Sequence, residues 1–185
     1  MLSWIDVAVV VLVVGYTVLG MRQGVIRRLA GLVAVYVGFA AATFVSPLAG
    51  SVIQQGFPGL AYTDARVYTY LALFALITAA CEGLALAYRH QIEISFVALD
   101  RASGVVAGLG TALLAVAAVI LLLDGAANPA VGNRDVMQIH LRQAVTSARL
   151  GGADEKLLGG PASAFFYPVY PHDPQSYFEL APATS

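Results

Sequence analysis

Glu82 is the side chain with the clearest capacity for chemistry, because it interrupts a long apolar run over residues 67–88. A charged group at membrane depth is costly, so such a residue is a candidate for moving an ion or a solute. The structural alternative is that Glu82 pairs with Arg89 or Arg101, or reaches the interface. It lies about 9 Å from the end of its run at the helical rise. The sequence leaves both interpretations open.

A second group of charges lies beside the ends of apolar runs. Asp100 precedes an uncharged run and can act as its N-cap, accepting hydrogen bonds from free amides of the first turn. Arg101 suits anionic lipid head groups. Arg27 forms a basic turn with Arg22 and Arg28, whose simplest role is to set the membrane topology. The candidate functional residues are therefore Glu82, Asp100, Arg101 and Arg27.

The residue patterns of known enzyme sites are missing from the sequence. His90, His140 and His172 are scattered without metal-ligand spacing, and no nucleophile motif or phosphate loop occurs. Residues 104–110 resemble a nucleotide-binding fingerprint, but they lie in an apolar run with no strand before it. Cys81 is the only cysteine, so no intrachain disulfide can form. We expect no enzyme activity, no cofactor and no metal site, and the net charge of −1 gives no indication of a nucleic-acid partner.

The elements that must position these residues are membrane-spanning helices. Hydrophobic residues make up 59% of the 185-residue chain and charged residues 11%, against roughly 25% charged in ordinary soluble domains. Residues 102–123 hold no charge over 22 positions, enough for one helix to cross a hydrocarbon core of about 30 Å. Similar runs cover residues 7–21, 25–47 and 67–88, and their continuous apolar character excludes a β-barrel. The sequence predicts an all-α fold, an integral membrane bundle of four transmembrane helices over residues 1–124.

The links between the predicted helices indicate the orientation of the bundle. Pro47 is expected to end the second helix, because proline cannot continue it, and residues 49–64 are expected to form a loop. Basic residues gather in the first and third loops, which places those loops in the cytoplasm. With an even number of spans, both termini are then predicted to be extracytoplasmic.

Residues 125–185 have a different character and are predicted to form an extracytoplasmic tail. Residues 135–150 place apolar side chains on one face, which indicates a short amphipathic helix that Gly151 and Gly152 end. The proline- and aromatic-rich segment that follows is predicted to be irregular. Its aromatic rings favour a protein surface or the membrane interface, so the tail docks either on a partner or on its own bundle. The candidates for partner contact are Phe165, Phe166, Tyr167, Tyr170, Tyr177 and Phe178.

Small residues at four-residue spacing form stripes along three of the predicted helices. Helices in lipid pack through small residues that let backbones approach closely. The stripes favour either a tight bundle in which the second, third and fourth helices touch, or an oligomer that uses one of those faces. They consist of Ala34, Gly38 and Ala42 in the second helix, Ala75, Ala79, Gly83 and Ala87 in the third, and Gly104, Gly108 and Ala112 in the fourth.

Three short segments resemble the bacterial colicin V production protein family, over about residues 4–124. Residues 100–104 (Asp-Arg-Ala-Ser-Gly), followed by Gly108, are similar to the family's Asp-Arg-x-Leu-Gly-x-x-x-Gly motif. Residues 24–27 (Gly-Val-Ile-Arg) resemble its turn between the first two helices, and residues 4–6 (Trp-Ile-Asp) resemble its opening. The sequence departs from the family pattern at Gln23, Arg28, Ser103 and Thr111.

The resemblance implies a bacterial inner-membrane protein with four spans, linked to the production or export of the peptide toxin colicin V and to envelope processes. Our leading hypothesis is a non-enzymatic bundle that supports toxin production, secretion or envelope processes through contacts with other membrane proteins. One alternative is a small permease or channel that uses Glu82, and another is an accessory subunit of a larger membrane complex. The expected partners are membrane lipids and either other membrane proteins or further copies of the chain.

Overall fold

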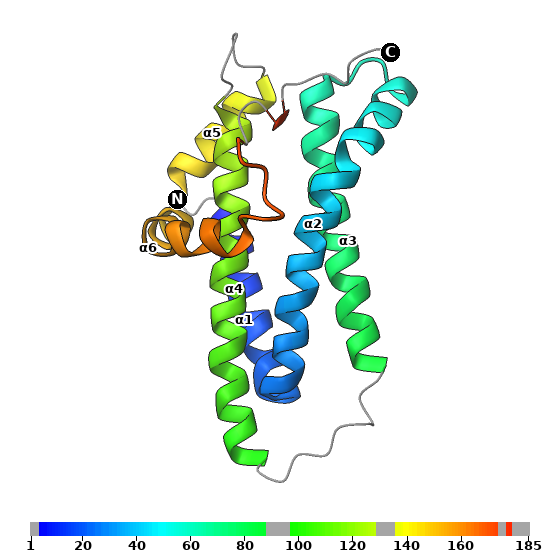
Figure 1. Ribbon diagram of the computed structural model, residues 1–185. Coiled ribbons are helices and arrows are strands. Elements are labelled where there is room, and N and C mark those ends of the chain that lie inside the picture. Colours follow the sequence, from blue (N-terminus) through cyan, green and yellow to red (C-terminus); the bar gives the residue numbers. More distant parts are fainter. Residues whose placement is uncertain (1–3, 88–96, 129–135, 174–176, 179–185) are drawn as a thin grey trace.

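The described part of the chain forms six helices, and the long ones build an elongated bundle (Figure 1). The computed structural model describes residues 4–87, 97–128, 136–173 and 177–178, and no strand occurs among them. The prediction of an all-α fold is therefore confirmed. The helices are α1 (Trp4–Gln23), α2 (Val25–Gly56), α3 (Tyr62–Ala87), α4 (Val97–Ala127), α5 (Val136–Ser147) and α6 (Arg149–Phe166).

Helices α1 to α4 are each long and apolar enough to cross a membrane, which confirms the four predicted spans. Their outer surface is itself apolar: large side chains such as Phe44, Leu76 and Val106 point outward and are largely exposed. A soluble bundle would turn these side chains inward, whereas lipid solvates them without cost. The chain is accordingly an integral membrane protein.

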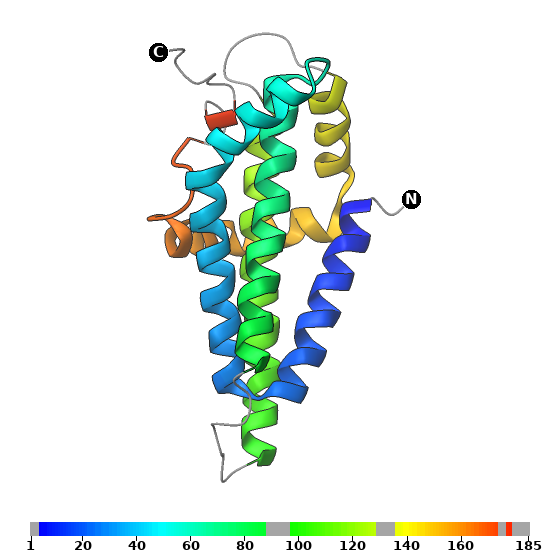
Figure 2. The ribbon, with the colours of Figure 1, turned by 90° about the vertical axis from the view of Figure 1, so that its right-hand side faces the viewer.

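Helix α4 is the centre of the bundle. It runs antiparallel to α1 along one side, while α2 and α3 form an antiparallel pair along the other (Figure 2). Among the most deeply buried side chains of α2, α3 and α4 are Val35, Phe39, Tyr70, Ala117 and Leu122. The first turn of α1 lies toward the same end of the bundle as α5.

The expectation that Pro47 ends the second helix is wrong. Helix α2 continues through Pro47 to Gly56, so most of the predicted loop over residues 49–64 is helical. A proline inside a helix has no N–H, and the carbonyl four residues earlier loses its donor. Here that carbonyl belongs to Thr43, and the hydroxyl of Tyr177 donates to it at 2.6 Å. The tail thus replaces the missing helical hydrogen bond.

The tail is more helical than predicted. Helix α5 falls within the predicted range 135–150, but the break comes at Ala148, and the glycine pair expected to end the helix lies inside α6. Helix α6 runs crosswise to the bundle axis and packs on α4 (Figures 1 and 2). These tertiary contacts outweigh the low helix propensity of its glycines. The irregular segment begins only at Tyr167.

Candidate functional site

Glu82 forms an ion pair with Arg28, whereas the sequence suggested Arg89 or Arg101 as its partner. Arg28 Nη2 donates to Glu82 Oε1 at 2.8 Å. The Arg28 side chain is 1% exposed and that of Glu82 is 22% exposed. Arg101 lies at the surface, and Arg89 lies outside the described residues. Arg28 is therefore a structural partner within the bundle and more than a marker of topology.

The guanidinium of Arg28 occupies a space made for it by small residues. Its central carbon lies 4.2 Å from the centre of the Tyr16 ring, in a cation–π contact. A Cβ on Gly31 would lie 2.6 Å from Arg28 Nη2, and one on Gly108 would lie 3.4 Å from Arg28 Cδ. Residues from α1, α2, α3 and α4 thus meet at this point. We call Tyr16, Arg28 and Glu82 the ion-pair cluster.

The ion-pair cluster borders a small groove between α1, α3 and α4, with a volume of about 230 Å³. Its walls are mainly apolar, and Glu82, Tyr16 and Thr78 supply the polar atoms. Because Arg28 already neutralises Glu82, the groove presents little net charge to a solute. Among the residues that the structure describes, no group of three histidine, cysteine, aspartate or glutamate side chains could hold a metal ion. The ion-pair cluster thus contains a neutralised, partly buried ion pair, and no nucleophilic side chain lies beside a base in it.

Asp100 caps a different helix from the one predicted. Helix α4 begins at Val97, so Asp100 lies within its first turn, and its Oδ1 accepts from the backbone N–H of Val25 at 2.9 Å. That N–H is the first of α2, and the preceding Gly24 has φ +78°, where a side chain is disfavoured. A Cβ on Gly24 would also collide with the Asp100 carboxylate. Asp100 therefore fastens the turn between α1 and α2 to the start of α4.

The remaining charged candidates are Arg101 and Arg27. Arg101 is exposed, one residue beyond the capping aspartate. The backbone of Arg27 belongs to α2, but its side chain lies outside what the structure describes.

The small-residue stripes of α2 and α4 lie at close helix contacts. Gly104 and Gly108 of α4 face α1, where a Cβ on either would collide with a backbone carbonyl oxygen, of Gly20 and Tyr16 respectively. The sequence predicted that the second, third and fourth helices touch through their stripes. It did not predict that the stripe of α4 packs against α1. On α2, Gly38 faces α3, where a Cβ would collide with Thr78. The neighbouring stripe residues Ala34, Ala42 and Ala112 are fully buried.

The stripe of α3 has no such contact within the described part of the chain. Ala75, Ala79, Gly83 and Ala87 are exposed. A Cβ on Gly83 would meet no atom within 4 Å. Ala75 and Ala79 border the groove beside Glu82. This face of α3 is open from the groove to the lipid-facing surface.

The aromatic tail packs on its own bundle through four of its six aromatic residues. Phe166 and Phe178 are completely buried, and Tyr170 and Tyr177 are partly buried. The Phe166 ring lies 4.7 Å from that of Phe39. Of the six candidates for partner contact, Phe165 and Tyr167 remain exposed.

Tyr177 is the centre of a hydroxyl network that the sequence did not reveal. Its hydroxyl donates to the Thr43 carbonyl and lies 2.9 Å from Ser46 Oγ. The Thr43 hydroxyl donates to the Val169 carbonyl at 2.8 Å and lies 3.0 Å from the Tyr70 hydroxyl. The buried Arg66 guanidinium lies 4.1 Å from the centre of the Tyr177 ring. We call Thr43, Ser46, Tyr70 and Tyr177 the tyrosine cluster.

Four apolar helices, joined by a buried ion pair and by glycine contacts, define a multi-pass α-helical membrane protein. The chain belongs to the colicin V production protein family, whose model matches residues 5–159. The match therefore extends beyond the four spans into α6, farther than the resemblance over residues 4–124 indicated. Neither a search of curated proteins nor a search of solved structures finds a match.

Proposed function

We propose that the protein is a non-enzymatic inner-membrane bundle that supports toxin production, secretion or envelope processes by binding other membrane proteins. The observation that carries this proposal is the exposed small-residue face of α3, which we call the α3 face: Ala75, Ala79, Gly83 and Ala87. A helix of a partner membrane protein is the expected occupant.

The argument for the α3 face comes from the rest of the bundle. The chain has small residues at close approaches between its helices, at Gly104 and Gly108 against α1 and at Gly38 against α3. Small residues at four-residue spacing lower the distance between helix axes and raise the number of van der Waals contacts. The α3 face has the same spacing, and among the described residues no helix of this chain lies against it. A helix of another protein could therefore pack against the small residues of the α3 face as α1 packs against Gly104 and Gly108 of α4.

The ion-pair cluster favours a structural role for the protein over the transport of an ion or a solute. Its carboxylate is neutralised at 2.8 Å by a guanidinium that is almost fully buried. A pair of this kind fixes the relative positions of α2 and α3, because separating the charges would leave each unpaired in a medium of low dielectric constant.

The experiment places a photo-crosslinking amino acid at Ala75 in the full-length protein and irradiates native membranes. We expect a crosslinked species that is lost in Ala79→Leu and Gly83→Leu, since a bulky side chain keeps the partner helix away. Ala80→Leu, at an exposed position one residue along the same helix, is the matched control and retains the crosslink. A species at a multiple of the 19.3 kDa chain mass would show a second copy instead of another protein. Recovery of uncrosslinked chain alone would refute the proposal.

A small permease is the second candidate, because Glu82 borders the 230 Å³ groove and keeps part of its side chain accessible. Its test is the flux of protons or small solutes into vesicles that contain the purified protein. Glu82→Gln would abolish such a flux, while Arg28→Gln/Glu82→Gln controls for the loss of folding. Equal background flux in all three forms would reject transport.

A further inference from the structure

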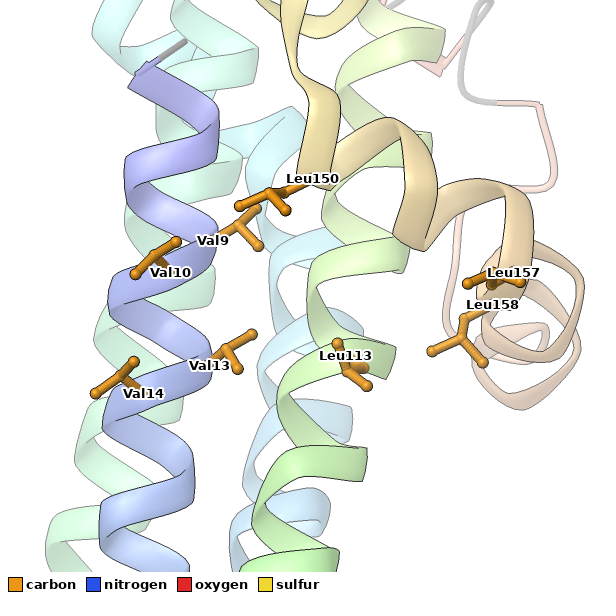
Figure 3. Close-up of a pocket in the computed structure, with 8 residues that line it drawn as sticks. All are labelled: Val9, Val10, Val13, Val14, Leu113, Leu150, Leu157 and Leu158. Atoms are coloured by element: carbon orange, nitrogen blue, oxygen red, sulfur yellow. The ribbon is translucent and has the colours of Figure 1, made fainter. Parts of the chain in front are cut away.

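A second, larger groove lies between α1, α4 and α6, with a volume of about 710 Å³. All eight residues that line it are valine or leucine (Figure 3). The volume falls within the range of roughly 300–1,000 Å³ that is typical of small-molecule sites. Because no lining side chain can donate or accept a hydrogen bond, the groove suits a hydrocarbon chain and not a polar ligand. We call it the α6 groove.

Two anchors hold α6 across the bundle and create the α6 groove. At one end, Asp6 Oδ1 in the first turn of α1 accepts from the backbone N–H of Leu150, at 2.9 Å. Asp6 is 1% exposed, so this bond is shielded from water. At the other end, Phe166 is buried against Phe39 of α2. Helix α6 therefore bridges from α1 to α2 over α4, as Figures 1 and 2 show.

The length of α1, the shortest of the four candidate spans, favours a position of α6 at a membrane interface. Helix α1 has 20 residues and is about 30 Å long, which equals the thickness of the hydrocarbon core. Its first turn, which holds Asp6, then lies at one interface, and so does the start of α6. A helix that lies there crosswise to the spans is parallel to the membrane plane. The α6 groove extends from it along Val9, Val10, Val13 and Val14, toward the middle of the bilayer.

Helix α6 carries both of the features expected of an interfacial helix that contacts lipid. Leu157, at the edge of the groove, is 77% exposed, which is unfavourable in water and favourable in hydrocarbon. Arg149 and Lys156 are exposed and seven residues apart, so they lie on one side of the helix. Asp154 and Glu155 balance the formal charge of α6, but they occupy other positions of the helical turn, so the two cations act locally. Cations at this level attract the anionic head groups of phospholipids.

We propose that the α6 groove binds one acyl chain of an anionic phospholipid, whose head group lies beside Arg149 and Lys156. Val9 and Val13 form the inner wall and the leucines of α6 the roof. The lipid is a resident ligand that holds α6 to α1, and this site is separate from the α3 face.

The test measures retained phospholipid by native mass spectrometry. The full-length protein is reconstituted in vesicles of phosphatidylglycerol or phosphatidylcholine with identical acyl chains and then extracted in mild detergent. We expect wild type to retain one phosphatidylglycerol per chain. Val13→Phe narrows the groove and lowers retention about tenfold, because it displaces about two methylene groups of the ligand. Val11→Phe makes the same change at an exposed position outside the groove and leaves retention unchanged.

Two further variants keep the proposal falsifiable if Val13→Phe does not fold. Leu157→Ala, at a mostly exposed position, is expected to lower retention several-fold. Arg149→Gln/Lys156→Gln is expected to reduce the preference for phosphatidylglycerol over phosphatidylcholine while a lipid is still retained. Equal retention by Val13→Phe and Val11→Phe would overturn the proposal, as would a second protein chain retained in place of lipid. An unchanged lipid preference in the arginine and lysine variant would overturn the assignment of the head group.

Discussion

The ion-pair cluster and the tyrosine cluster solve the same problem by different means. Both place polar groups inside an apolar bundle, where an unsatisfied donor or acceptor costs free energy. The first pairs two full charges, Arg28 and Glu82, from adjacent helices. The second joins neutral hydroxyls to the carbonyl that Pro47 leaves without a helical donor. Loss of either charged partner strongly destabilises the ion-pair cluster. In the tyrosine cluster several hydrogen bonds share the stabilisation, and each contributes modestly.

The largest effect is expected at the charged cluster. Glu82→Gln leaves the Arg28 guanidinium buried without a counter-charge, so the free energy of unfolding should fall by about 3–5 kcal/mol. The double variant Arg28→Gln/Glu82→Gln removes both charges and should regain more than half of that loss. Thermal or denaturant unfolding of the full-length protein in detergent micelles measures both. Additive losses in the double variant would mean that the two side chains do not stabilise one another.

An intermediate effect is expected where α1 and α4 touch, next to the ion-pair cluster. Gly108→Ala brings a Cβ against the Tyr16 carbonyl, and such overpacking should lower the free energy of unfolding by about 1–3 kcal/mol. Gly110→Ala is the control in the same helix, because a Cβ there meets nothing within 4 Å. It should be neutral or stabilise the protein by up to about 1 kcal/mol, since alanine favours a helix over glycine. The same unfolding measurement separates them, and equal losses would argue against the close contact.

The smallest effect is expected at the tyrosine cluster. Tyr177→Phe removes the donor to the Thr43 carbonyl and should cost about 1 kcal/mol. In a Pro47→Ala background the helix supplies its own N–H to that carbonyl, so the same tyrosine change should cost less. Hydrogen exchange at residues 44–50, with unfolding curves for the four forms, measures the coupling. A cost that is the same in both backgrounds would show that Tyr177 does not compensate for the proline.

The four spans were predictable because their cause is local. A run of apolar residues has to leave water, whatever its neighbours are, and length alone tells whether it crosses the bilayer. The glycines of α4 were likewise identified from their spacing, although their partner α1 was not. Identifying that partner requires the order of helices around the bundle, and the spacing of one stripe does not contain it.

The parts that sequence reasoning missed depend on residues far apart in the chain. Arg28 and Glu82 are separated by 54 positions, so their pairing follows from the packing of α2 on α3. Arg28 stands beside two other arginines, and this pattern is typical of a loop that sets topology. The sequence predicted that Pro47 ends the helix because proline offers no N–H to the carbonyl of Thr43. The tail supplies the missing donor, the hydroxyl of Tyr177. Only the aromatic content of the tail indicated that it docks on a protein surface.

The distance in sequence between Thr43 and Tyr177 has a consequence for biogenesis. The second span is synthesised and inserted long before Tyr177, which follows Thr43 by 134 residues, leaves the ribosome. Until then the nascent hairpin of α2 and α3 holds a carbonyl that water, lipid head groups or a chaperone must satisfy. A residue of the tail therefore completes a helix that is synthesised much earlier, and a product truncated before Tyr177 would be a substrate for membrane quality control.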